Sequence, residues 1–187
     1  MSSSGSWGLQ AVAALALIVL AATPQATAKT KAHKPSVQPQ AESSAGGLAD
    51  AMLRTHNTVR AKVGAPPVTW DKSLAQQAAG WAENNLRLGR LQHSSAEQRH
   101  GAGENLAGIF GAHLSPDALA AGWVRERDAY THGPIDCEGN WAATGHYTQM
   151  VWSNTKRIGC GVASDATGEV LVCRYAPTGN VCGERPY

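Results

Sequence analysis

A predicted β-hairpin near the end of the chain constrains the fold more than any other feature. Residues 157–163 and 169–175 alternate apolar and polar positions with the period of two that a strand requires, and residues 164–168 form a turn between them. Antiparallel pairing around this turn places Cys160 opposite Cys173, at a separation that a disulfide can bridge. We therefore predict the hairpin and a Cys160–Cys173 disulfide together.

The other two cysteines, Cys137 and Cys182, also lie in the last third of the chain. Four cysteines allow three connectivities, and an even number in an exported chain favours disulfides. If the hairpin pairs Cys160 with Cys173, then Cys137 pairs with Cys182 by elimination and ties the tail to an earlier loop. A cysteine zinc site is disfavoured because there is no closely spaced Cys-x-x-Cys pair.

The N-terminal 28 residues have the features of a signal peptide. They carry no charged side chain, and their largely apolar run from Leu9 to Ala22 is too short to span a bilayer comfortably. Ala26 and Ala28 provide the small-x-small pattern at which signal peptidase cleaves. We predict cleavage after Ala28 and an extracellular protein. An uncleaved anchor is the alternative, because no Lys or Arg precedes the apolar run.

Residues 29–47 are predicted to be a disordered linker, and residues 48–187 a single domain. The linker is rich in Lys, Pro, Ser, Gln and Ala, and it has too few apolar residues to bury. Three of the 16 Lys and Arg residues and one of the 14 Asp and Glu residues fall in the linker, so the domain is formally neutral. Nucleic-acid binding is not indicated, because it requires a clustered positive surface. The linker lysines could contact a cell-wall or membrane surface.

Helical periodicity appears in three segments of the domain. Residues 48–63 form the first, with His56 at the edge of its apolar arc, where we expect a core histidine bonded to backbone rather than a ligand. The second follows the N-cap Asp71 and ends near Leu88, and the third runs from the N-cap Ser115 to about residue 130. Residues 89–114 show no sustained period and are predicted to be a loop.

Two polar residues occupy apolar positions. Glu126 shares a narrow helical arc with Leu119 and Trp123, so its carboxylate lies on the buried side, where acids are rare unless they are paired. Residues 145–152 (GHYTQMVW) are interpreted as a strand, in which His146 heads a mostly apolar row. Taken alone, each of these two residues is consistent with a structural role and with a role in a functional site.

Several motifs together resemble the CAP superfamily of cysteine-rich secretory proteins, antigen 5 and pathogenesis-related group-one proteins. The resemblance covers about residues 48–187 and rests on four stretches: residues 145–161, residues 170–180, His56-Asn57 with Arg60, and residues 103–107 (GENLA). It implies an α+β fold, a three-layer α-β-α sandwich with a central, mainly antiparallel sheet.

The resemblance also implies a central cavity with two histidines and two glutamates, which are His93, Glu104, Glu126 and His146 here. Two of them, Glu126 and His146, are the polar residues at apolar positions. Two imidazoles and two carboxylates could bind Zn²⁺, Cu²⁺ or another divalent metal, with the glutamates as ligands or as acceptors behind the histidines. No cofactor is required by the sequence.

Three functions follow from the resemblance and the residues. The favoured one is a secreted binding module for a sterol, a fatty acid or a surface ligand in defence or competition. The alternative is an extracellular protease or esterase in which a metal-bound water, or Glu104 or Glu126 as general base, attacks the substrate. The third is a structural cell-wall protein. An enzyme is disfavoured because no activated nucleophile is evident; Ser94 and Ser95 only adjoin His93 in sequence.

The tail, residues 177–187, resembles the C-terminal segment that plant pathogenesis-related members release as a signalling peptide. Arg174 stands where those members usually have Asn, and Cys182 would tether a released peptide. We therefore do not favour peptide signalling.

Overall fold

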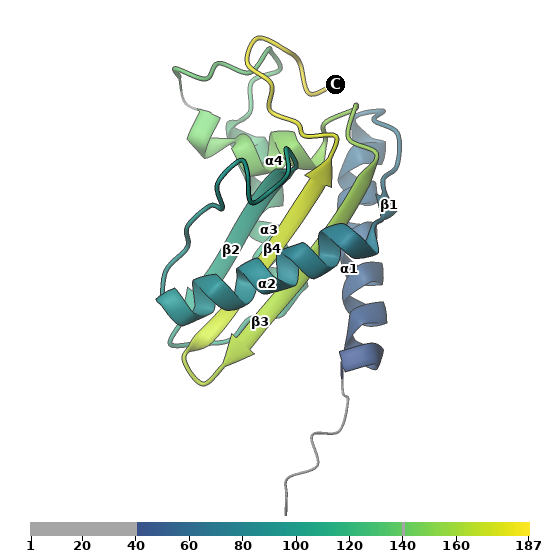
Figure 1. The fold of residues 1–187 in the computed structure, drawn as a ribbon. Helices are drawn as coiled ribbons and strands as arrows, with labels where there is room; N and C mark the ends of the chain where they lie inside the picture. The colour runs from purple at the N-terminus through teal and green to yellow at the C-terminus, as the bar shows by residue number, and fades with distance from the viewer. Residues whose placement is uncertain (1–40, 140) are drawn as a thin grey trace, which may run out of the picture. The chain divides into compact units, whose positions relative to one another are not determined.

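The computed structural model describes residues 41–139 and 141–187, which form one compact unit (Figure 1). The predicted signal peptide and residues 29–40 of the predicted linker lie outside the described residues. The first helix, α1, spans Ala41–Lys62, so residues 41–47 of the predicted linker are helical instead. Ala41 and Glu42 are good helix formers, and no proline follows Pro39 in this stretch, so the helix extends past the first apolar position of its periodic face.

A four-stranded sheet forms the centre of the domain. It contains β1 (Thr69–Trp70), β2 (Gly103–Phe110), β3 (Arg157–Asp165) and β4 (Gly168–Ala176) in the order β1-β3-β4-β2. The short β1 pairs parallel with β3, and the other pairs are antiparallel. The predicted hairpin is confirmed, since Cys160 pairs with Cys173 in the β3–β4 register and the two form a disulfide.

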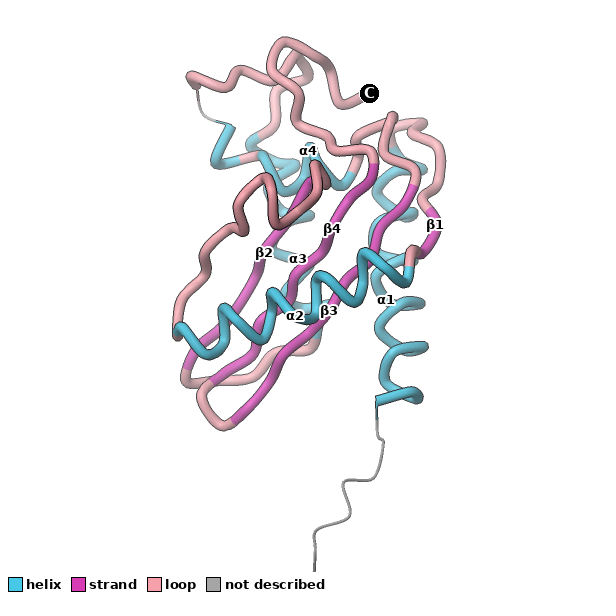
Figure 2. The backbone as a smooth tube through the Cα atoms, in the orientation of Figure 1, coloured by secondary structure: helices cyan, strands magenta, loops and turns pink. Residues whose placement is uncertain are grey.

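Helices cover both faces of this sheet, as a three-layer sandwich requires (Figures 1 and 2). The helix α2 (Lys72–Leu88) crosses one face and packs on Val170 and Val172 of β4. On the other face, α1, α3 (Pro116–Arg125) and α4 (Gly145–Met150) pack on Leu171, Cys173 and Tyr175. Alternate residues of β4 therefore pack into the two hydrophobic clusters on opposite faces of the sheet. For this reason β4 is buried along most of its length.

Two glycines of β3 allow α2 to lie very close to the sheet. A methyl group on Gly161 would overlap the backbone of Ala79, and one on Gly159 would overlap the backbone at the start of α2. The helix presents Ala75 and Ala79 to this contact, so small residues meet on both sides. This close approach fixes α2 and the loop that follows it over the sheet.

The predicted helix caps are confirmed. The side chain of Asp71 accepts hydrogen bonds from the backbone N–H groups of Ser73 and Leu74, and Gly89 closes α2 with a left-handed backbone (φ 63°). Ser115 caps α3 in the same way, with Pro116 as the first helical residue. The third predicted helix is shorter than expected, because α3 ends at Arg125 and a 3₁₀ turn, Glu126–Ala129, follows.

The structure contradicts two further sequence predictions. Residues 145–150 are the helix α4 and not a strand, and residues 103–110 of the predicted loop are the edge strand β2. A short segment that alternates imperfectly fits either period, and here contacts from distant residues decide. Glu126 accepts hydrogen bonds from the backbone N–H groups at the start of α4, and β2 forms by pairing with β4 along its whole length.

Buried polar groups of α1 hold the far end of α4. Arg60 Nη1 donates to the carbonyl oxygens of Met150 and Trp152, 2.9 and 2.8 Å away. His56 is buried, donates from Nδ1 to the Met52 carbonyl, and accepts at Nε2 from the Tyr175 hydroxyl. The prediction that His56 is a core residue bonded to backbone is therefore confirmed.

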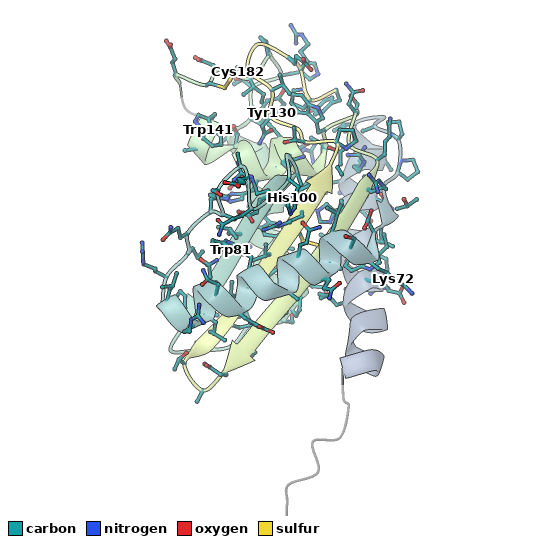
Figure 3. The ribbon with its side chains drawn as sticks, in the orientation of Figure 1. Lys72, Trp81, His100, Tyr130, Trp141 and Cys182 are labelled. Carbon is teal, nitrogen blue, oxygen red and sulfur yellow. A yellow bond between two sulfur atoms is a disulfide. The ribbon has the colours of Figure 1, made fainter. Side chains whose placement is uncertain are left out.

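The tail is bound back onto the loop before α4. Cys137 and Cys182 form the second expected disulfide, and Ile135 exchanges backbone hydrogen bonds with Gly183 and Glu184. Figure 3 shows Cys182 at the same end of the molecule as Trp141 and Tyr130. None of the helices in the described part of the chain has the length and apolar character needed to cross a membrane.

Candidate functional site

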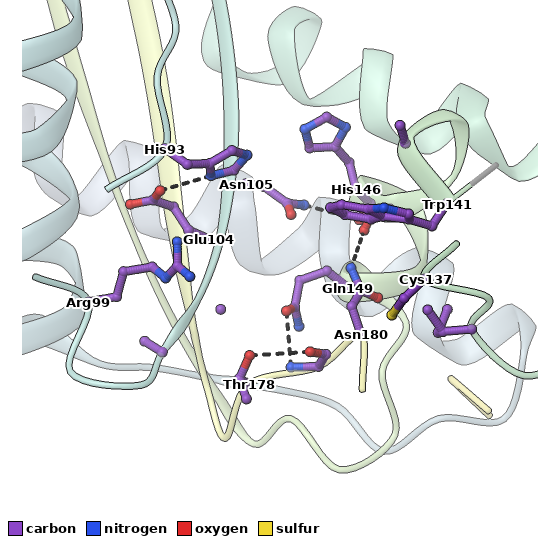
Figure 4. A pocket seen from close by; sticks show the side chains of 16 residues that line it. His93, Arg99, Glu104, Asn105, Cys137, Trp141, His146, Gln149, Thr178 and Asn180 are labelled. Atoms are coloured by element: carbon purple, nitrogen blue, oxygen red, sulfur yellow. Dashed lines mark hydrogen bonds and ion pairs between the residues drawn. The ribbon is translucent and has the colours of Figure 1, made fainter. Parts of the chain in front are cut away.

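A cavity of about 720 Å³ opens between the start of β2, the start of α4 and the tail (Figure 4). Three of the four residues expected from the resemblance line it, namely His93, Glu104 and His146. The remaining lining residues are Arg99, Ala102, Gly103, Asn105, Ile135, Cys137, Trp141, Ala142, Gly145, Gln149, Thr178, Gly179 and Asn180. Glu126 is not among them and lies behind His146.

The first histidine–glutamate pair links the loop after α2 to β2. His93 Nδ1 donates to Glu104 Oε1 at 2.9 Å, and the backbone N–H of Ser94 donates to the same oxygen at 2.9 Å. The Ser94 hydroxyl donates to Glu104 Oε2 at 2.7 Å. The Glu104 side chain is only 1% exposed, whereas that of His93 is 52% exposed. The carboxylate is thus saturated, and the imidazole is open to the cavity.

A buried arginine completes the surroundings of Glu104. Arg174 is its cross-strand neighbour on β4, and Arg174 Nη2 lies 3.4 Å from Glu104 Oε2. Burial alone would raise the pKa of Glu104, but the hydrogen bonds from His93 and Ser94 and the charge of Arg174 hold that pKa below its ordinary value. Arg174 also donates to Gln77 of α2 and to the Gln98 carbonyl. It therefore fastens the loop after α2 to the sheet.

The second pair links the 3₁₀ turn after α3 to α4. His146 Nδ1 donates to Glu126 Oε1 at 2.6 Å, and the backbone N–H groups of His146 and Tyr147 donate to Glu126 Oε2. The indole of Trp123 stacks on the His146 ring, with centroids 6.0 Å apart. Glu126 is the partly buried acid that periodicity indicated, with a side chain 19% exposed, and these three donors compensate its loss of water.

Both histidines therefore have the same arrangement. Each gives its Nδ1–H to a carboxylate, which fixes the tautomer and leaves Nε2 as a lone-pair donor. Figure 4 shows both rings at the cavity, which they enter from different elements. Within residues 41–139 and 141–187, however, no three His, Cys, Asp or Glu side chains converge closely enough to hold a metal ion. The atoms that these two histidines offer to a ligand are the imidazole Nε2 atoms, with the carboxylates behind them.

Ser94 does not form a nucleophile–base pair with the histidine beside it. Its hydroxyl donates to Glu104, accepts from Arg174 Nη2 at 3.2 Å, and is buried. A nucleophilic serine needs a base to accept its proton and an open path to the substrate. The Ser94 hydroxyl is instead a structural link between the loop and the sheet.

Sequence reasoning missed several cavity residues. Arg99 and Trp141 lie in segments without regular period, and the tail residues Thr178 and Asn180 reach the cavity only because the chain folds back. Trp141 rests over Gly145, where a side chain would overlap its ring. The glycine that begins α4 was the available signal, since a close approach often requires glycine.

Comparison with known proteins agrees with this fold. Residues 53–175 match the model of the CAP family, described as the cysteine-rich secretory protein family. Pathogenesis-related leaf protein 4 of Solanum lycopersicum is 42% identical over 136 residues, which cover 72% of this chain and 80% of that protein. Pathogenesis-related protein 1 of Arabidopsis thaliana is 38% identical, with the same coverage.

Solved structures share the fold. The crystal structure of NaASP2 with Zn²⁺ has a TM-score of 0.66 at 23% identity and covers 75% of this chain and 85% of its own. Schistosoma mansoni venom allergen-like protein 4 has a TM-score of 0.57 at 27% identity and covers 75% and 93%. The three-layer sandwich with its disulfide-braced cavity defines the class of protein. The chain belongs to the CAP family, and the curated relatives named above are pathogenesis-related proteins.

Proposed function

We propose that this chain is an extracellular binding protein of the pathogenesis-related type, which takes a small ligand in the cavity between His93 and His146. The observation that carries the proposal is the pair of imidazoles, each oriented by a carboxylate on Nδ1 and each with Nε2 left for a ligand. A cavity of about 720 Å³ is in the range that binds small molecules. The two disulfides and the family description suit an oxidising, extracellular setting.

A divalent metal is part of this proposal. His93 and His146 would hold it through Nε2, and Glu104 and Glu126 would act behind them by orienting the rings. Zn²⁺ suits neutral imidazole nitrogens, and NaASP2, a structural neighbour, has been solved with Zn²⁺. When bound, the metal would supply an electron-pair acceptor for an oxygen atom of the ligand. The sterol or fatty-acid ligand that the family resemblance implies stays a prediction.

Calorimetric titration of the purified domain with Zn²⁺ tests the metal centre. The wild type should bind, and the His93→Ala, His146→Ala double variant should lose at least about tenfold in affinity. The His113→Ala variant is the matched control, because His113 lies on the surface against Glu169, away from the cavity. Equal heats from the wild type and the double variant would refute the metal site.

A screen with casein and small esters, with and without Zn²⁺, separates a binding protein from a hydrolase. The binding proposal expects no turnover above buffer. Turnover that is abolished by Glu104→Gln would favour the hydrolase, because the amide cannot act as a base.

Expression of the full chain, followed by N-terminal sequencing of the exported protein, tests secretion, with cleavage expected after Ala28.

A further inference from the structure

The cavity is lined by an arginine, Arg99, that is not part of either histidine–glutamate pair. Four of its lining side chains can carry charge, namely His93, Arg99, Glu104 and His146. The one acid among them, Glu104, is nearly inaccessible and already bonded to three neighbouring residues. The ionisable groups that a ligand would meet are therefore an arginine and two imidazoles.

Arg99 is held in place but not neutralised. Its Nη1 donates to the backbone carbonyl of Ser94 at 2.7 Å, which anchors the guanidinium without a counter-charge. Among the described residues, Arg99 has no carboxylate within salt-bridge distance, whereas Arg174 has Glu104. Arg99 also lies close enough to Arg174 for its charge to lower the pKa of that guanidinium, after the larger effect of burial. The two arginines therefore lie near one another, and of the two only Arg174 has a carboxylate partner.

The opposite wall of the cavity is flat and apolar. Figure 4 places Trp141 across the pocket from Arg99 and Glu104. Trp141 is 46% exposed, and Ile135 and the Cys137 side of the disulfide line the cavity with it. Two side-chain amides that line the cavity already form hydrogen bonds within the protein. Asn180 is bonded to Thr148 and Gly145, and Gln149 is bonded to Gly179 and Thr155. They offer a ligand little further hydrogen bonding.

We propose that the ligand of this cavity is a small organic acid, whose carboxylate is bound by Arg99 beside His93 and whose planar or apolar body lies against Trp141. This inference rests on the proposed function, because it names the class of ligand for the same cavity. The planar fork of a guanidinium matches a carboxylate in geometry, and a half-exposed indole suits an apolar ring. A neutral ligand of the same shape would leave the charge of Arg99 uncompensated.

Calorimetric titration with benzoate, benzamide and acetate tests this ligand class, in a low-chloride buffer that contains a chelator. Benzoate should bind at least about tenfold more tightly than the isosteric, neutral benzamide, because a charge-assisted hydrogen bond is lost with the amide. Benzoate should also bind more tightly than acetate, which has no ring for Trp141. Equal affinities for benzoate and benzamide would overturn the proposal, with no variant needed.

Two variants assign the roles. Arg99→Gln should weaken benzoate binding at least about tenfold and leave benzamide unchanged, while Trp141→Ala should weaken benzoate but not acetate. The control is Arg90→Gln, an exposed arginine outside the cavity, which should bind as the wild type does. Thermal unfolding of each variant checks that the fold is retained. Wild-type affinity for benzoate in a folded Arg99→Gln protein would refute the role of Arg99.

The zinc titration separates this inference from the proposal on which it rests. If Zn²⁺ binds through His93 and His146 but benzoate does not bind, only the carboxylate assignment is wrong. If benzoate binds in an Arg99-dependent way without Zn²⁺ binding, the ligand class stands and the metal centre fails. If neither binds, the cavity is not a ligand site of the kind proposed.

Discussion

Glu126 holds His146 at two places at once. Its Oε2 accepts the backbone N–H of His146 at 2.9 Å, and its Oε1 accepts the imidazole Nδ1–H at 2.6 Å. Thr144, at the N-cap position of α4, makes no capping bond with its side chain, so a carboxylate from the turn after α3 takes over that function. Glu126 therefore both caps the N-terminus of α4 and orients His146, the candidate metal-binding residue on that helix.

Glu126→Ala should accordingly destabilise the domain as well as impair the site. We expect a loss of about 2 kcal/mol in the free energy of unfolding, because the helix loses its cap and a charge-assisted hydrogen bond. Urea denaturation followed by far-ultraviolet circular dichroism measures it. Glu97→Ala, which removes an exposed acid, is the control and should change stability little. A Glu126→Ala protein as stable as that control would contradict the capping role.

Arg174→Met should be more damaging than any single change at the cavity wall. It leaves the buried carboxylate of Glu104 without its cation, which typically costs about 3–5 kcal/mol. The double variant Arg174→Met, Glu104→Gln removes both charges and should recover part of this loss. Urea denaturation of the wild type, the two single variants and the double variant gives the coupling energy. Strict additivity would show that the two side chains do not interact.

Gly161→Ala and Gly80→Ala should have opposite effects, although both add one methyl group. At Gly161 the methyl group would overlap the backbone of Ala79, so the close packing of α2 on β3 must open, at about 1–3 kcal/mol. Gly80 lies on α2 with open space around it, and alanine should stabilise the helix by about 1 kcal/mol. Thermal denaturation measures both. Equal shifts of the two melting temperatures would argue against the close contact.

The buried His56 should make stability depend on pH between about 4 and 6.5. Burial lowers the pKa of His56 to about 4, with a smaller lowering from the charge of Arg60, while the unfolded chain titrates near 6.5. Between these values the unfolded state binds the extra proton, so this stabilising contribution is complete above pH 6.5 and is lost as the pH falls to about 4. The loss is about 3 kcal/mol.

His56→Gln removes this titration and is the comparison for it. The variant is less stable at neutral pH, but its stability should fall less steeply between pH 6.5 and 4 than that of the wild type. Urea midpoints at half-unit steps of pH give both curves. Parallel curves would mean that His56 does not titrate in this range.

The two disulfides should differ in their reactivity toward a dithiol reductant. Cys137 and Cys182 are exposed beside the cavity, whereas Cys160 and Cys173 are buried between the sheet and the α1 layer. Thiolate attack requires access to sulfur, so mild reduction should open Cys137–Cys182 first. Alkylation followed by peptide mass spectrometry identifies the thiols released. Equal labelling of all four cysteines at early times would contradict this order.

Features that depend on neighbours in the sequence could be predicted before the structure. The β3–β4 hairpin with its disulfide, the caps at Asp71 and Ser115, and the core role of His56 all follow from hydrogen bonds or packing that a local pattern encodes. The four residues of the candidate site came from a family resemblance. Periodicity indicated only Glu126 and His146 among them, and for His146 it did so through a strand that is a helix in the structure.

Only the tertiary structure decided the secondary structure of α4 and β2 and the set of charged groups around the cavity. Residues 145–150 are helical because Glu126 and Arg60, each distant in sequence, satisfy the two ends of the helix. Arg174 reaches Glu104 across 70 positions, and Arg99 and Trp141 face each other only after the loops fold. A local sequence pattern predicts hydrogen bonds between residues that are a few positions apart. A buried charge or a cavity wall is instead stabilised by residues that are distant in sequence and meet only in the folded chain.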